Sequence, residues 1–187
     1  EKRKDLLFVG NVIKRKGVYF LIDSLSTFLL ENQNIQLRII GKKEDLKYYS
    51  KINEIVNKRN LQKSVIFLDE LGQKEIAKYM NSSKILLMAS SSEGLPRVLI
   101  EAGFCGLPSI ASNIDGIHDP FSLRGGTLVY ELNSQKELIE NVNSLYNNEV
   151  LWMELSQQSL KLSEEIAGKG SFAKNWENLI NMMELNE

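Results

Sequence analysis

The sequence is poor in the residue types that build disulfides and zinc sites. Its 187 residues include one cysteine, Cys105, and one histidine, His118. A single cysteine excludes an intrachain disulfide, and this pair cannot supply a zinc site made of several Cys and His ligands. The apolar neighbours of Cys105 predict a buried, unreactive side chain in a reducing compartment. His118 has no visible partner and is interpreted as an ordinary loop histidine.

The sequence also lacks an excess of either charge and any long apolar run. It carries 23 Lys and Arg against 24 Asp and Glu, so no overall field attracts nucleic acid or anionic lipid, and phosphate binding must be local. Tyr48, Tyr49 and Tyr130 are scattered and predicted to lack a basic face, which argues against nucleic-acid binding. Apolar stretches such as ILLMA at 85–89 are far shorter than the ~20 residues of a membrane span. With no signal peptide visible, we expect a cytoplasmic protein.

The first residues suggest a piece of a longer protein. The chain opens with EKRKDLLFVG, has no initiator methionine and runs directly into a strand-like segment. This is expected of a fragment cut at a domain boundary. We therefore expect an N-terminal part to be missing and interpret residues 1–187 as a single domain.

Short strand-like runs alternate with longer helical ones along most of the chain. This alternation predicts a doubly wound, Rossmann-like α/β/α sandwich with about six parallel strands. From 134 to 187 only helices are expected, with breaks near Asn147 and Gly168 and a last helix that carries Phe172, Trp176 and Leu179. Such sheets bind ligands outside the carboxyl ends of their strands. The strands are expected at 6–10, 35–41, 64–69, 84–89, 108–112 and 126–130, and the earlier helices at 17–31, 44–60, 73–82 and after Pro96.

The segment EGLPRVLIEAGFCGLP, residues 93 to 108, places Glu93 before a helix and Glu101 inside its apolar run. Pro96, near the first helical position, leaves the backbone N–H groups of the helix start free to bind an anion such as phosphate. A buried Glu101 needs a partner, because an unpaired buried carboxylate is unfavourable. Two partners remain open. One is Arg97, one turn earlier, and the other is a diol such as a ribose, whose two hydroxyls match the two carboxylate oxygens.

The longer span EGLPRVLIEAGFCGLPSIAS resembles the donor-binding signature of retaining glycosyltransferases of the GT-B fold, in particular glycosyltransferase family 4 (glycosyl transferases group 1). These enzymes have two Rossmann-like halves, and this chain resembles the C-terminal half over nearly its full length. The resemblance implies that Glu93 and Glu101 form the E-x7-E motif of the family. On that basis Glu93 contacts hydroxyls of the donor sugar and Glu101 takes the ribose hydroxyls.

A second segment, FVGNVIKRKG at 8–17, resembles the strand–loop–helix in which a basic pair of this family holds the diphosphate. Lys16 falls on the lysine position, whereas the usual arginine is replaced by Asn11, which leaves Arg15 as a candidate substitute. Alone, the KRK run reads as a solvated cationic loop. The resemblance implies Glu93 and Lys16 as catalytic residues. It implies the following binding residues: Gly10, Asn11, Arg15, Lys16, Gly41, Leu71, Glu93, Gly94, Leu95, Pro96, Val98 and Glu101.

The activity implied by the resemblance is transfer of a hexose from a nucleotide diphosphate sugar to an acceptor, with retention, in bacterial polysaccharide or glycolipid synthesis. A UDP-sugar is the first expectation for the donor and a GDP-sugar the second. No cofactor and no metal are expected, since the chain has no Asp-x-Asp pair, and no P-loop or G-x-G-x-x-G motif occurs. The expected partners are the nucleotide-sugar and the missing N-terminal acceptor domain, without nucleic acid.

Several alternatives stay open at this point. The chain reads as the donor half of an enzyme and is expected to be inactive alone. A nucleotide-sugar binding module without its own catalysis, or a nucleotide-sugar epimerase of the same fold, would share these residues. Peripheral association of the full-length enzyme with the inner face of the membrane is also left open.

Overall fold

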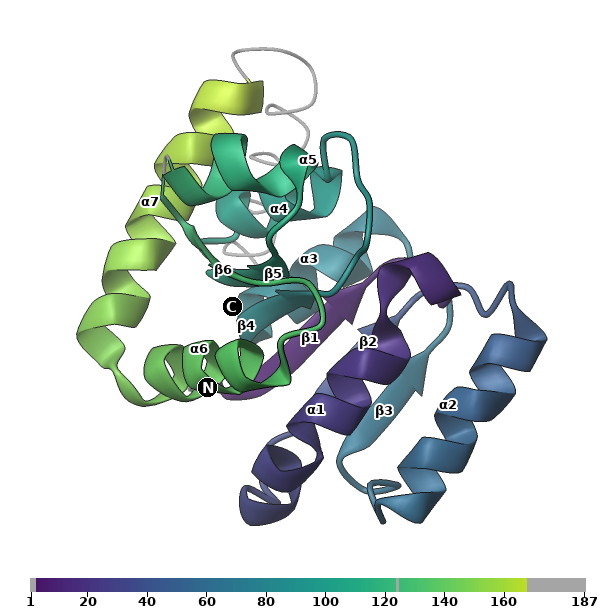
Figure 1. The fold of residues 1–187 in the computed structure, drawn as a ribbon. Helices are drawn as coiled ribbons and strands as arrows, with labels where there is room; N and C mark the ends of the chain where they lie inside the picture. The colour runs from purple at the N-terminus through teal and green to yellow at the C-terminus, as the bar shows by residue number, and fades with distance from the viewer. Residues whose placement is uncertain (1–2, 124, 168–187) are drawn as a thin grey trace.

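The computed structural model describes residues 3–123 and 125–167 and contains a six-stranded sheet between two layers of helices (Figure 1). The strand order is β3-β2-β1-β4-β5-β6, and every neighbouring pair is parallel. The Rossmann-like sandwich predicted from the sequence is confirmed, and each strand overlaps its predicted range. The strands are β1 (Asp5–Val9), β2 (Leu37–Ile40), β3 (Val65–Leu68), β4 (Ser83–Met88), β5 (Ser109–Ser112) and β6 (Thr127–Tyr130).

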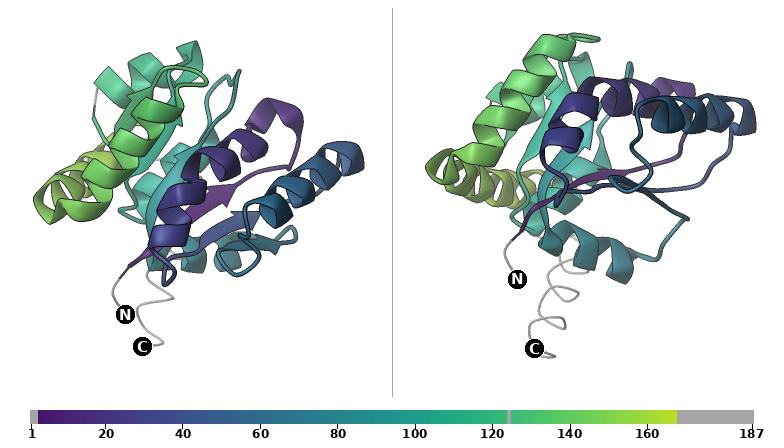
Figure 2. Two further views of the ribbon diagram at one scale, coloured as in Figure 1. Left: turned by 60° about the horizontal axis from the view of Figure 1, so that its bottom comes forward. Right: turned by 90° about the horizontal axis from the view of Figure 1, so that it is seen from below.

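The helices divide between the two faces of the sheet (Figure 2). One face is covered by α1 (Val18–Glu31), α2 (Leu46–Lys58) and α6 (Gln135–Asn147), and the other by α3 (Gln73–Ser82) and α4 (Arg97–Phe104). The last described helix, α7 (Glu149–Ala167), contributes to both cores, and α6 ends at the predicted break. The helix predicted around Phe172 and Trp176 lies outside the described residues.

Apolar periodicity explains why these segments adopt these structures. In α1 the predicted apolar side is buried, with Leu21, Leu25 and Leu29 recurring at intervals of four residues. All six residues of β4 are buried, as expected for a central parallel strand covered by helices on both faces. No helix among the described residues is long and apolar enough to cross a membrane.

The strand order reverses between β1 and β4, the kind of point at which parallel sheets bind ligands. From β1 the chain continues into α1 on one face, whereas from the adjacent β4 it continues into α4 on the opposite face. In sheets of this kind a ligand crevice is expected between the loops that follow two such strands, at the carboxyl edge of the sheet.

The segment after β5 differs from expectation because it is helical rather than an open loop. A short α5 (Asp115–Ile117) continues into a π-helical turn, η2 (His118–Leu123), so His118 is not a loop residue. The physical reason is apolar burial, since Ile117 and Phe121 pack into the core shared with α4. The KRK run also forms a 3₁₀ turn, η1 (Lys14–Lys16), rather than an irregular loop.

Cys105 is buried, as predicted. Burial raises the pKa of its thiol to about 12, so the thiolate that would act as a nucleophile is not populated near neutral pH. The prediction of an inert, packed cysteine is therefore confirmed.

The close crossing of α4 and α7 depends on a glycine, Gly103, at the point of contact. A Cβ atom on Gly103 would lie 2.5 Å from the backbone oxygen of Ser159 and even closer to the hydroxyl of Ser163. The two helices approach this closely because glycine occupies the contact, which leaves no space for even a methyl group.

We therefore expect Gly103→Ala to lower the free energy of unfolding by about 1 to 3 kcal/mol through overpacking, measured by urea denaturation. Gly94→Ala is the matched control, because a Cβ at Gly94 meets nothing within 4 Å. If Gly103→Ala and Gly94→Ala unfold with the same free energy, α7 can move to make room for the added methyl group without loss of stability. The crossing of α4 and α7 is then not tightly packed.

Candidate functional site

Glycines bring the loops of the crevice into backbone contact. A Cβ on Gly41, at the end of β2, would collide with the carbonyl of Gly10, at the end of β1. A Cβ on Gly17 would collide in the same way with the carbonyl of Ala89, after β4. Only glycine permits this approach, so the ends of three adjacent strands form one packed floor.

The loops after β1 and β4 are joined through one carboxylate oxygen. Lys16 Nζ lies 2.6 Å from Glu93 Oε1, and Arg15 Nη1 lies 3.1 Å from the same atom. Arg15 also donates to the carbonyl of Ser92, and its own carbonyl accepts from the N–H of Ser91 at 2.9 Å. Adjacent residues of η1 thus place two cations at one point of the crevice.

The environment of Glu93 keeps it ionised. Burial acts to raise the pKa of its carboxyl, but the hydrogen bond and charge of Lys16 and the charge of Arg15 outweigh burial, so the pKa is lowered. Lys16 and Glu93 are mostly buried, with side chains 19% and 11% exposed, while Arg15 is 46% exposed. The ion pair with Lys16 is the more shielded from water and therefore the stronger of the two.

Glu101 is in a different electrostatic state on α4. Burial raises the pKa of its carboxyl, and Arg97 opposes this only through its charge. No hydrogen bond or ion pair to this carboxylate is found within residues 3–123 and 125–167. Arg97, the nearer candidate partner, makes no ion pair with it there, so the carboxylate is available to a ligand.

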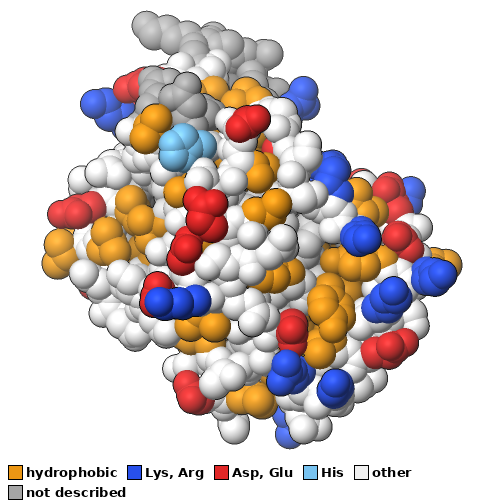
Figure 3. All heavy atoms as spheres, in the orientation of Figure 1, with side chains coloured by type: hydrophobic (Ala, Val, Ile, Leu, Met, Phe, Trp, Pro, Cys, Tyr) orange, Lys and Arg blue, Asp and Glu red, His pale blue; other side chains and the backbone are white. Residues whose placement is uncertain are grey.

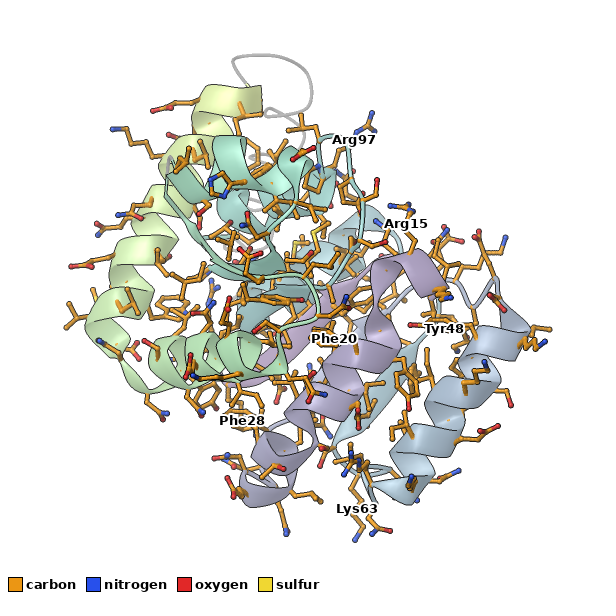
Figure 4. All side chains as sticks on the ribbon, in the orientation of Figure 1. Arg15, Phe20, Phe28, Tyr48, Lys63 and Arg97 are labelled. Carbon is orange, nitrogen blue, oxygen red and sulfur yellow. The ribbon has the colours of Figure 1, made fainter. Side chains whose placement is uncertain are left out.

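The first turn of α4 is open at the crevice. Its cap residue Pro96 makes no side-chain hydrogen bond to the turn, the Cβ position of Gly94 faces empty space, and Leu95 is 54% exposed. Free N–H groups at a helix start favour an anion. Figure 4 shows Arg15 and Arg97 along the same side of the molecule, the first from η1 and the second from the start of α4.

The remaining predicted residues are more spread out. Leu71 follows β3, at the far edge of the sheet, and is part of the apolar core on the α3 side. Val98 is half-buried against the same core. Asn11 is exposed, and its side chain forms no hydrogen bond with the described residues. The structure therefore brings Arg15, Lys16 and Glu93 together but not Asn11.

Sequence reasoning missed a set of residues beside the crevice. Tyr48 was expected to lack a basic face, yet it lines a hollow together with Lys14, Lys51 and Lys58. The expectation is wrong because Lys51 and Lys58 share α2 with Tyr48, and the fold adds Lys14 from η1. The spacing of Tyr48, Lys51 and Ile55, at three and four residues along α2, was the available signal.

The pKa of Glu101 leads to a stability prediction. The folded state holds a proton on Glu101 more tightly than the unfolded state, so this group makes the protein less stable as pH rises through its folded pKa. We expect Glu101→Gln to raise the free energy of unfolding at pH 7 and to have a smaller effect as pH falls below the unfolded pKa. Chemical denaturation across pH measures this, with the exposed Glu154→Gln as control. A loss of stability at pH 7 would mean that the carboxylate is paired within the chain.

The comparisons agree with this architecture. Residues 1–166 match the family described as glycosyl transferases group 1. The capsular polysaccharide biosynthesis glycosyltransferase CapH of Staphylococcus aureus is 31% identical over 115 residues, which is 61% of this chain and 32% of CapH. The chain spans 43 to 49% of the length of the first three curated relatives that it matches.

Two solved structures show the same fold. The C-terminal domain of the group 1 glycosyl transferase LpcC of Francisella tularensis superposes with a TM-score of 0.80 at 19% identity, over 89% of this chain and 87% of that domain. HepE of Anabaena in complex with UDP-glucose superposes with a TM-score of 0.79 at 15% identity, over 98% of this chain and 49% of HepE. The fold is that of the C-terminal domain of GT-B glycosyltransferases, and the chain belongs to the glycosyl transferases group 1 family.

Proposed function

We propose that this chain is the donor-binding half of a retaining glycosyltransferase of family 4, which transfers a hexose from a nucleotide diphosphate sugar. The observation that carries the proposal is the convergence of Lys16, Arg15 and Glu93 beside the open first turn of α4. A diphosphate needs cations and N–H donors, and a sugar needs a fixed carboxylate. The crevice offers all three together.

The diphosphate is proposed to lie between η1 and the start of α4. Lys16 and Arg15 would approach it from one side and the free N–H groups after Pro96 from the other. Arg15 takes the part that an arginine at position 11 has in the family, since its guanidinium already reaches the crevice. Gly10, Gly41, Gly94 and Leu95 would border the donor through their backbone.

The nucleoside is proposed to lie along α4. The unpaired, half-buried carboxylate of Glu101 would accept hydrogen bonds from the two ribose hydroxyls, which are worth about 1.5 to 3 kcal/mol each when they reach a charged group. Val98 would contact the ribose, and the region of Leu71 would contact the base. A UDP-sugar is the first candidate, supported by the UDP-glucose complex of HepE on a similar fold, and a GDP-sugar is the second.

The reaction breaks the bond between the anomeric carbon and the diphosphate oxygen, and negative charge grows on the leaving group. Lys16, Arg15 and the α4 terminus stabilise that charge without a metal, the largest contribution expected of such a site. Glu93 orients the sugar by accepting from its hydroxyls. Lys16 and Glu93 are therefore the proposed catalytic residues of this half, and the acceptor binds to the N-terminal half.

The whole protein is proposed to act in bacterial polysaccharide or glycolipid synthesis in the cytoplasm, including at the inner face of the membrane. CapH, a relative of this chain, is named for capsular polysaccharide biosynthesis. The chain spans about half the length of its first curated relatives, and the role proposed for this half by itself is nucleotide-sugar binding. An activity assay of the full-length protein separates two alternatives. A transferase consumes the donor only when an acceptor is present, whereas an epimerase of the same fold converts the donor alone.

The Glu101 assignment is tested by calorimetry with UDP. We expect Glu101→Ala to weaken binding by about 1.5 to 3 kcal/mol, because the ribose loses its charged acceptor. Glu154→Ala, an exposed site on α7, is the control and should bind like wild type. Equal affinity of Glu101→Ala and wild type would rule out the ribose contact.

The diphosphate assignment is tested by a pair of substitutions in one loop. We expect Arg15→Ala to weaken UDP binding roughly three- to tenfold and to reduce its dependence on salt, since one half-exposed cation is lost. Asn11→Ala should leave the affinity unchanged. If Asn11→Ala weakened UDP binding and Arg15→Ala did not, the diphosphate contact would be assigned to position 11 instead.

A further inference from the structure

A second hollow lies beside the crevice, around the first turns of α1. Its volume is about 680 Å³, in the range of small-molecule binding sites. Its walls come from η1, α1, α2 and the loops after β4 and β6. We call it the α1–α2 groove and define it by three aromatic and three basic residues: Tyr19, Phe20, Tyr48, Lys14, Lys51 and Lys58.

Two of the three aromatic side chains of the groove, those of Tyr48 and Phe20, are held in place. The hydroxyl of Tyr48 accepts a hydrogen bond from the backbone N–H of Tyr19 at 3.0 Å, which ties α2 to the start of α1. Phe20 stacks on Tyr130, with ring centroids 6.1 Å apart and planes 16° from parallel. Tyr19 is 38% exposed. The groove thus presents aromatic surface at little cost in side-chain entropy.

The groove is cationic, although the chain as a whole is not. Four basic residues line it, Lys14, Arg15, Lys51 and Lys58, against one acidic residue, Glu54, while the net charge of the chain is −1. The three lysines are exposed, and none forms an ion pair with the described part of the chain. In the view of Figure 3, basic side chains flank an apolar strip over α1 and α2.

The groove and the crevice share a wall. Arg15 lines the groove and donates to Glu93 at 3.1 Å. Ser91 also lines the groove, two residues before Glu93, and its N–H donates to the carbonyl of Arg15. A ligand in the groove therefore ends close to the carboxylate proposed to orient the transferred sugar.

We propose that the α1–α2 groove binds an anionic oligosaccharide, a stretch of the acceptor chain that extends beyond the N-terminal half. This inference rests on the proposed function. Sugar rings pack on aromatic faces, and unpaired lysines complement carboxylate or phosphate groups along the chain. The groove is concave and its aromatic rings form its walls, which suits a discrete chain better than a flat membrane.

The test is calorimetry of the 187-residue chain with tetragalacturonate, which carries one carboxylate per ring, and with neutral maltotetraose of the same length. We expect tetragalacturonate to bind and maltotetraose to bind at least about fivefold more weakly. The double substitution Lys51→Gln/Lys58→Gln should weaken tetragalacturonate binding at least about fivefold and leave UDP binding unchanged.

The matched control is Lys74→Gln/Lys78→Gln, which removes two exposed charges from α3 on the opposite face of the sheet. It should bind tetragalacturonate like wild type. Tyr19→Ala should weaken binding of the oligosaccharide without changing its salt dependence, because it removes stacking and no charge.

The proposal would be overturned if tetragalacturonate did not bind. It would also be overturned if Lys51→Gln/Lys58→Gln and Lys74→Gln/Lys78→Gln weakened tetragalacturonate binding equally. A preference of the same lysines for phosphatidylglycerol vesicles or for a single-stranded oligonucleotide over the oligosaccharide would overturn it too, because either would assign the groove to another ligand. A separate titration with UDP and GDP keeps the two proposals distinct. Failure of both UDP and GDP to bind overturns the donor site, whereas bound nucleotide without bound tetragalacturonate overturns only the groove.

Discussion

The contact on which the crevice depends is one carboxylate oxygen shared by two cations. Glu93 Oε1 accepts from Lys16 and Arg15, and these residues come from loops that enter opposite helix layers. Without the carboxylate, two neighbouring positive charges would repel each other, and without the cations the partly buried carboxylate would lose its compensation. The excess of one positive charge in this trio leaves a residual attraction for an anion. The same contact therefore holds the loops together and leaves them suited to the diphosphate proposed to bind there.

Arg15 links the two hollows of the carboxyl edge. Its guanidinium points to Glu93 in the crevice, while the residue also lines the α1–α2 groove with Lys14 and Ser91. In the proposed arrangement the donor lies on the α4 side of this residue, and the stretch of the acceptor chain in the groove lies on the α1 side. The two substrates of a transfer reaction would then meet at a single side chain, which is what orientation of the reacting groups requires.

Much of the fold and part of the candidate site could be predicted from the sequence. The features that could not be predicted depend on contacts between residues far apart in the chain. The six strands and the apolar side of α1 follow from short-range periodicity, which depends only on neighbouring residues. The placement of Glu93 at the strand end followed from the alternation of elements. The direction of Arg15 could not be predicted, because it depends on the carbonyl of Ser92, 77 positions away in sequence. Among the basic residues near Tyr48, Lys14 comes from η1 and is brought there by the fold, whereas Lys51 and Lys58 share its helix and were readable from their spacing. The helical turn at 115–123 depends on tertiary burial of Ile117 and Phe121.

Gly116 has a consequence for how the site moves. A Cβ at this position would overlap the backbone oxygens of both Glu93 and Gly94, so the turn after β5 is in direct backbone contact with the peptide that carries the carboxylate proposed to orient the sugar. A rearrangement of residues 115–123 that moved Gly116 toward this peptide would have to displace Glu93 as well, because there is no free space between the two backbones.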